Sequence, residues 1–246
     1  MKFPLLKGIY LLMFLSVFLG CDSEDEDREP QLPEVVTVSD ESEAVITYTS
    51  VQISGTVMET DSEIQSYGVV WGPNPNPTLE DNVALPEGQS ATTSISKSTQ
   101  KQSESSFVVK IEGLVPGNSY YFRIFATNEA GTAYGEELSI ETKGLEGSKW
   151  GITYHHDEDT SWIGHAVFHE DGTAFYSEPT DPDGMFDLWG EWSMEGNVLT
   201  YDMIPDDEGE SYILTGELHE NEMSGTYTFL TSDGITHRPW TATLIE

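Results

Sequence analysis

The chain is poor in cysteine and in basic residues, and each shortage excludes a class of protein. Cys21 is its only cysteine, so no disulfide can form within the chain. Its 10 lysines and arginines face 44 aspartates and glutamates, which gives a formal net charge of −34 at pH 7. A chain this acidic repels nucleic-acid phosphates and anionic lipid headgroups. We therefore expect no nucleic acid among its partners.

Long apolar runs are also scarce, and the exception lies at the N-terminus. Lys2 and Lys7 accompany an apolar run over residues 9–20. This run is shorter than the ~20 residues that a membrane-spanning helix needs. It is followed by carboxylates, whereas basic residues would hold such a helix on the cytoplasmic side. We predict that residues 1–20 form a cleaved export signal.

The segment Leu19-Gly20-Cys21 resembles the end of the lipobox of bacterial lipoproteins, although Phe18 stands where that box usually has leucine. The resemblance implies cleavage before Cys21 and acyl chains on its thiol and its new amino group. Several acyl chains anchor a protein stably in a membrane where one does not. The alternative is an ordinary signal peptide followed by a stray cysteine, but an exposed thiol is a liability in an oxidising compartment.

The residues after Cys21 are acidic, DSEDED, and residues 21–32 also contain Pro30. The run resembles the surface-export signal of lipoproteins from the Bacteroidota, which implies display on the outer face of the outer membrane. Its charge and its proline also suit a solvated, self-repelling tether. The two interpretations are compatible, because one segment can serve as both address and spacer.

The rest of the chain predicts β-structure in two domains. Short alternating apolar runs are separated by turns of Gly, Pro, Asn and Asp, and no stretch has helical spacing. A seam at residues 143–147 separates a first domain, 33–143, from a second, 147–246. In the first domain, Leu114 to Tyr120 has the form of a tyrosine corner, in which the Tyr120 hydroxyl binds upstream backbone.

This first domain resembles a fibronectin type III domain, on the segments YGVVWGPNPNPTLEDN, IEGLVPGNSYYFRIFATNEAGTAYG and SIETK. The resemblance implies a β-sandwich that serves as a spacer or as a protein-binding module.

The second domain contains about eight short strand patterns joined by tight turns such as Glu170-Asp171-Gly172 and Glu195-Gly196-Asn197. Sequential hairpins favour an up-and-down antiparallel β-barrel or a closely related sandwich. The pattern is similar to small lipocalin-like domains, on Gly147 to Trp150, a DGT turn, Gly190-Glu191-Trp192, GNVLTY, MSGTY and a final WTA. Lipocalins proper have one residue between the opening Gly and Trp, and this chain has two.

The tryptophans of the second domain divide into two groups. Trp150, Trp192 and Trp240 lie among apolar alternates, and we expect them to fill the barrel. Trp162 opens a strand after an acidic loop, and Trp189 faces away from Trp192. These two are the better candidates for exposed ligand contacts, because aromatic side chains stack on sugars and are enriched at binding hot spots.

A carboxylate cluster offers one candidate metal site. Asp181, Asp183 and Asp187 lie close enough in the sequence to supply oxygens to calcium. They do not complete the spacing of an EF-hand loop. The alternative, a solvated acidic turn, is the commoner one on so acidic a surface, and we predict no other cofactor.

The sequence thus predicts a non-catalytic, lipid-anchored surface protein that binds a glycan, a small apolar ligand or a surface protein. It contains no serine elbow, phosphate loop or zinc-protease motif. The alternative function is that of an accessory component or hydrolase in the processing of surface polysaccharide.

Overall fold

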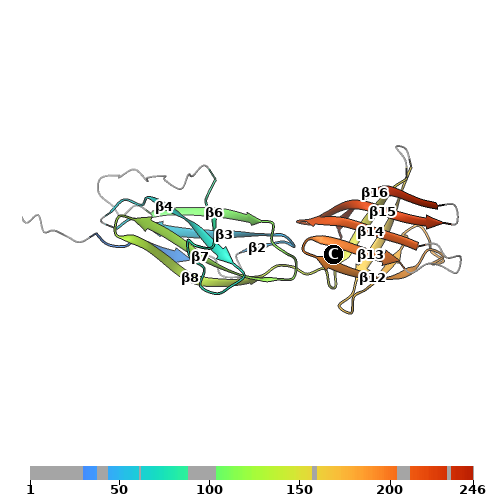
Figure 1. The fold of residues 1–246 in the computed structure, drawn as a ribbon, viewed down its shortest axis with the longest axis horizontal. Coiled ribbons are helices and arrows are strands. Elements are labelled where there is room, and N and C mark those ends of the chain that lie inside the picture. Colours follow the sequence, from blue (N-terminus) through green and yellow to red (C-terminus); the bar gives the residue numbers. More distant parts are fainter. Residues whose placement is uncertain are drawn as a thin grey trace, which may run out of the picture.

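A computed structural model describes residues 30–37, 44–60, 62–87, 104–156, 160–203, 211–231 and 234–245. Over these residues the chain forms 16 β-strands and no helix, which confirms the predicted all-β class. Two β-structures follow one another along the long axis of the molecule, a two-sheet sandwich and then a closed barrel (Figure 1). None of the described residues forms a helix long and apolar enough to cross a membrane. The signal at residues 1–20, the anchor at Cys21 and most of the 21–32 tether lie outside the described residues.

The sandwich consists of two four-stranded sheets. One sheet contains β1 (Glu34–Thr37), β2 (Val45–Ile46), β3 (Ser50–Met58) and β6 (Glu104–Glu112). The other contains β4 (Ser66–Gly72), β5 (Asn82–Ala84), β7 (Ser119–Asn128) and β8 (Gly131–Glu141). Ile53 of the first sheet and Val69 and Phe122 of the second belong to one buried core, so the two sheets pack face to face.

The predicted tyrosine corner is confirmed at the hydrogen-bond level. The backbone N–H of Val115 donates to the Tyr120 hydroxyl, and the distance between nitrogen and oxygen is 3.0 Å. This bond ties the start of β7 to the preceding turn, where Gly117 adopts a positive φ of 66°.

The barrel contains the remaining eight strands. They are β9 (Lys149–His155), β10 (Ser161–Phe168), β11 (Thr173–Ser177), β12 (Leu188–Glu195), β13 (Val198–Met203), β14 (Ser211–His219), β15 (Glu222–Thr231) and β16 (Gly234–Leu244). Each pairs antiparallel with the next, and β16 pairs with β9 to close the barrel. The predicted up-and-down antiparallel barrel is therefore confirmed.

The end of the barrel that faces the sandwich, here called the near end, carries the tight turns at residues 169–172, 195–197 and 220–221. It is filled by large apolar side chains. Trp150 and Phe168 lie there and are at most 1% exposed. Trp240 is equally buried but lies farther along the barrel, directly opposite Tyr154 in the β16–β9 pairing. Two of the predicted core tryptophans are thus confirmed. Trp192 is half-buried and packs against the same core.

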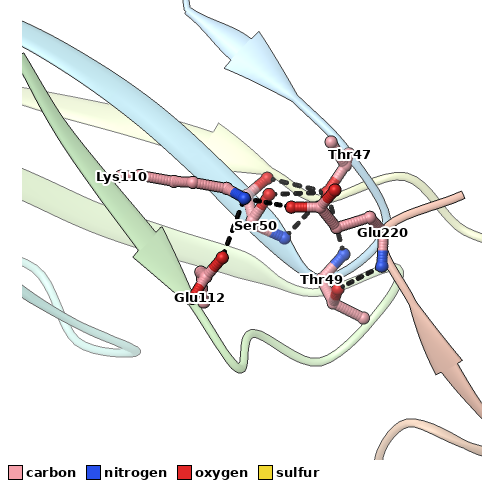
Figure 2. Close-up of polar contacts among 6 residues, drawn as sticks. All are labelled: Thr47, Thr49, Ser50, Lys110, Glu112 and Glu220. Carbon is pink, nitrogen blue, oxygen red and sulfur yellow. Dashed lines mark hydrogen bonds and ion pairs between the residues drawn. The ribbon is translucent and has the colours of Figure 1, made fainter.

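The sandwich and the barrel contact each other through a polar and an aromatic junction. Lys110 of β6 forms ion pairs with Glu112, at 2.8 Å, and with Glu220 in the β14–β15 turn (Figure 2). These carboxylates raise the pKa of Lys110 to about 12. The backbone N–H of Glu220 donates to the Thr49 hydroxyl over 2.8 Å (Figure 2).

The aromatic part of the junction is formed by Tyr48, which joins the buried core of the barrel. Its ring centroid lies 5.4 Å from that of Trp150 at the start of β9. The indole N–H of Trp150 donates to the Ser148 hydroxyl over 2.8 Å. The near end of the barrel is thus held against the sandwich by contacts beyond the connecting segment.

Candidate functional site: the tyrosine end of the barrel

The opposite end of the barrel has a different chemistry. Four tyrosines project inward in the half of the barrel away from the sandwich: Tyr154, Tyr176, Tyr201 and Tyr227. They are at most 4% exposed. The Tyr154 ring lies edge-to-face with those of Tyr176 and Tyr227, with centroids 5.9 and 5.2 Å away. We call these four residues the tyrosine cluster and this half of the barrel the tyrosine end.

Two glycines make room for the cluster. A Cβ at Gly164 would lie 2.0 Å from the Tyr176 ring, and a Cβ at Gly190 would lie 2.7 Å from the Tyr201 ring. Both distances are too short for any side chain larger than hydrogen. The glycines of β10 and β12 therefore allow the tyrosine rings to lie flat against neighbouring strands.

The hydroxyls of the cluster are unequally satisfied. Tyr176 donates a hydrogen bond to Glu178 over 3.2 Å. The Tyr201 hydroxyl is buried and has no hydrogen-bond partner among the residues that the structure describes. The buried Tyr154 hydroxyl meets no described partner at hydrogen-bond distance either, but it lies close enough to the Tyr176 hydroxyl to lower the pKa of that residue. A buried polar group without a partner costs about 1–3 kcal/mol, so this arrangement is unfavourable in the free protein.

Burial keeps these phenols neutral. It raises the pKa of Tyr154 well above its ordinary value and also raises the pKa values of Tyr176 and Tyr201. A neutral phenol retains its proton and can donate one hydrogen bond. The tyrosine end therefore offers hydroxyl donors to any acceptor that enters it.

Arg238 adds a positive charge to the inner face. It lies directly opposite Tyr227 in the β15–β16 pairing, and its side chain is half-buried. Within the described part of the chain, no carboxylate lies at salt-bridge distance from it. Burial raises the pKa of Tyr227, and the nearby Arg238 charge opposes this shift.

Aromatic and apolar side chains surround these polar groups. Trp162 of β10 stacks on Tyr154, with centroids 5.8 Å apart and planes 21° apart, and His156 lies 5.6 Å from the same indole. The rings of Tyr212 and Phe229 lie 4.5 Å apart on the neighbouring strands. In the loop of residues 178–187, Met185 is 77% exposed. This combination suits a ligand that has an apolar body and a polar group.

The two tryptophans predicted as contact residues lie in different places. Trp162 is half-buried on the inner face of the tyrosine end. Trp189 lies on the outer wall of β12, where it is 53% exposed and its centroid lies 5.0 Å from that of Phe175. It borders an open hollow of about 520 Å³ lined by Gly147, His169, Glu170, Asp171, Thr173 and Trp189. One ligand cannot contact both tryptophans without spanning the barrel wall.

The three candidate calcium ligands lie in the loop between β11 and β12. A carboxylate oxygen of Asp181 accepts a hydrogen bond from the backbone N–H of Phe186 over 2.8 Å, which holds the loop in its turn. Asp183 and Asp187 are exposed. Across the described ranges, no three histidine, cysteine or carboxylate side chains are arranged to hold a metal ion. The calcium site stays a prediction.

Sequence reasoning did not single out the tyrosine cluster or Arg238. The alternation Arg238, Trp240, Ala242 is a usable signal, because Trp240 and Ala242 are apolar and the arginine shares their face. An arginine in phase with the apolar positions of a barrel strand is a candidate for function, since such positions normally hold apolar side chains.

Comparison with known proteins finds no relative of this chain. No protein-family model, no curated protein and no solved structure matches it. The function of the tyrosine end must therefore be inferred from the side chains that form it.

Proposed function

We propose that this protein is a non-catalytic binding protein that takes a small ligand into the tyrosine end of its barrel. The observation that carries the proposal is a set of polar groups on the inner face: the buried hydroxyls of Tyr154 and Tyr201, which have no hydrogen-bond partner among the described residues, and the half-buried guanidinium of Arg238, which forms no ion pair with a described carboxylate. Polar groups inside proteins are normally hydrogen-bonded. A ligand that supplies the missing partners would remove this cost on binding.

The surroundings support binding better than catalysis. The phenols are held neutral by burial, so they are poor general bases and act as hydrogen-bond donors. Trp162 and the Tyr212–Phe229 pair offer apolar surface for the body of a ligand. Sites for small molecules are usually mostly apolar, with a few convergent polar groups that set orientation.

The rest of the chain serves display in this proposal. Cys21 carries the lipid anchor on the outer membrane, the 21–32 segment is the tether, and the sandwich is a fibronectin type III-like spacer. The barrel follows the sandwich and contacts it through its near end. The tyrosine end is therefore the end of the barrel away from the sandwich (Figure 1).

A thermal-shift screen of the purified chain tests the proposal. The probes are fatty acids, short glycans and calcium, and a ligand that binds only the folded state raises the melting temperature in a saturable way. We expect stabilisation by small amphiphilic molecules. The variant Trp162→Leu should lose this response, whereas the matched variant Trp189→Leu on the outer wall should keep it.

Two results would contradict the proposal. If the chain melts cooperatively and none of the fatty acids, glycans or calcium changes its melting temperature, the small-ligand proposal is contradicted and a protein partner becomes the next candidate. A response that depends on Trp189 and not on Trp162 would place the binding site on the outer wall.

A further inference from the structure

We infer that the ligand carries a single negative charge, best met by a carboxylate, and that Arg238 binds it. This inference rests on the proposed function, because it names the chemistry of the ligand at the same tyrosine end. The inference is drawn from the position of one charged side chain, that of Arg238. Arg238 is the one charged side chain at the inward positions of the barrel strands, over the residues that the structure describes.

The position of Arg238 is unusual for this chain. Basic residues are outnumbered by 44 to 10, and acidic partners are therefore abundant on the surface. Lys110 shows the ordinary outcome, since it pairs with two glutamates at the junction. Arg238 instead lies half-buried opposite Tyr227 with no carboxylate at salt-bridge distance among the described residues. A partly desolvated charge is costly unless a counter-ion or a charged ligand balances it.

The groups around Arg238 favour an acceptor. A guanidinium only donates hydrogen bonds, and the neutral phenols of Tyr154 and Tyr201 have protons to donate. Among the described residues, Glu178 places a carboxylate near the cluster, and it already accepts the hydrogen bond of Tyr176. A ligand oxygen could therefore accept hydrogen bonds from the guanidinium and from the neutral phenols together.

The number of charges favours a carboxylate over a phosphate. One guanidinium can neutralise one negative charge, and its planar fork matches the two oxygens of a carboxylate. A dianionic phosphate would leave a second charge facing Glu178 and the apolar rings. The stacked Trp162 and the Tyr212–Phe229 pair suit a flat or chain-like apolar body attached to the acid.

A pair of fluorescent probes isolates the charge from the apolar body. Anilinonaphthalene sulfonate is a monoanion, and phenylnaphthylamine is its uncharged parent with the same ring system. Both are titrated against the purified full chain and against two variants. Arg238→Met removes the inner cation, and Lys149→Met removes a cation from the outer face of β9 as a matched control for net charge.

We expect the native chain to bind the sulfonate at least ~10-fold more tightly than the uncharged parent, because a charge-assisted hydrogen bond is lost with the anion. Arg238→Met should weaken the binding of the sulfonate by a similar factor and should change the affinity for the uncharged parent by no more than about 2-fold. Lys149→Met should change neither affinity by more than about 2-fold, since Lys149 lies at the start of β9 on its outer face and does not contact the inner face. Fatty acids should displace the sulfonate, and the corresponding alcohols should not.

The failures of the two proposals are distinguishable. If both probes bind with equal affinity, depend on Trp162 and ignore Arg238→Met, the anionic ligand is wrong and the small-ligand function stands. If the sulfonate binds but depends on neither Trp162 nor Arg238, it binds elsewhere and the inference falls. If neither probe binds in a saturable way, both proposals fail.

Discussion

Removing a buried hydroxyl that has no partner should make the free protein more stable. Tyr201 is fully buried, and its hydroxyl finds no partner among the described residues. Tyr201→Phe deletes that oxygen and keeps the ring, which contacts Phe168 edge-to-face at 5.8 Å. The expected gain is the desolvation cost of one unsatisfied group, about 1–3 kcal/mol.

The size of this gain makes it measurable. For a domain of about 100 residues, 1 kcal/mol shifts the melting temperature by about 4–8 °C. We therefore expect the melting transition of the barrel to rise by at least about 4 °C in differential scanning calorimetry. Tyr154→Phe should act in the same direction, because its hydroxyl is also buried and has no partner at hydrogen-bond distance among the described residues.

The chain contains its own control for this substitution. The Tyr120 hydroxyl accepts a hydrogen bond from Val115 over 3.0 Å. Tyr120→Phe should therefore destabilise the sandwich by about 1 kcal/mol, the net contribution of an ordinary hydrogen bond. The same Tyr→Phe change is thus expected to lower the stability of the sandwich and to raise that of the barrel. If Tyr201→Phe lowers the melting temperature of the barrel, its hydroxyl has a partner in solution and the reasoning about the tyrosine end is refuted.

Three further predictions concern the core, the junction and pH. Trp150→Ala should destabilise the barrel by about 3–5 kcal/mol because it empties a fully buried site, whereas Trp189→Ala on the outer wall should cost less than about 0.5 kcal/mol by chemical denaturation. Lys110→Met should let the two domains reorient independently, seen as unequal rotational correlation times by NMR; unchanged, equal times would show that the aromatic contacts suffice. Hydrogen bonds from Thr173 lower the pKa of Asp171 in the folded state. The stabilisation from these bonds is therefore fully present above the pKa that Asp171 has in the unfolded chain, and it is lost as the pH falls through the lower pKa of the folded state. Thr173→Val should therefore melt earlier than the native chain at neutral pH and match it at low pH, and an equal difference across the whole pH series would contradict this assignment.

Strand positions were predictable because they depend on local alternation. Seven of the eight barrel strands lie within two residues of where apolar alternation and tight turns place them, and the eighth, β16, begins earlier than predicted. The short strands β2 (Val45–Ile46) and β5 (Asn82–Ala84) were not found, since two or three residues carry no measurable period. Pairing with a neighbouring strand defines such elements, and that pairing is not local information.

Sequence reasoning did not identify Arg238 for a more specific reason. The sequence pattern predicts a last strand from Trp240 to Leu244, directly after Pro239, a residue that central strands normally exclude. In the structure β16 begins at Gly234 and runs through Pro239, which pairs with Thr226. Arg238 therefore fell outside the predicted strand and received no inward face. The unpartnered state of the tyrosine hydroxyls was also beyond sequence reasoning, since it depends on distances between strands far apart in the chain.

The two ends of the barrel explain how one fold tolerates such a site. Every barrel strand runs between them, so a strand held firmly at the near end can carry unfavourable groups at the other. β9 has the fully buried Trp150 near its start, packed on Tyr48 of the sandwich, and near its end Tyr154, whose hydroxyl has no partner at hydrogen-bond distance among the described residues. β16 runs the opposite way, from Arg238 to the buried Trp240 and on to the near end. Burial of such large side chains contributes more than the ~1–3 kcal/mol that each unsatisfied hydroxyl costs. The near end therefore supplies the stability that lets the tyrosine end keep polar groups free for a ligand.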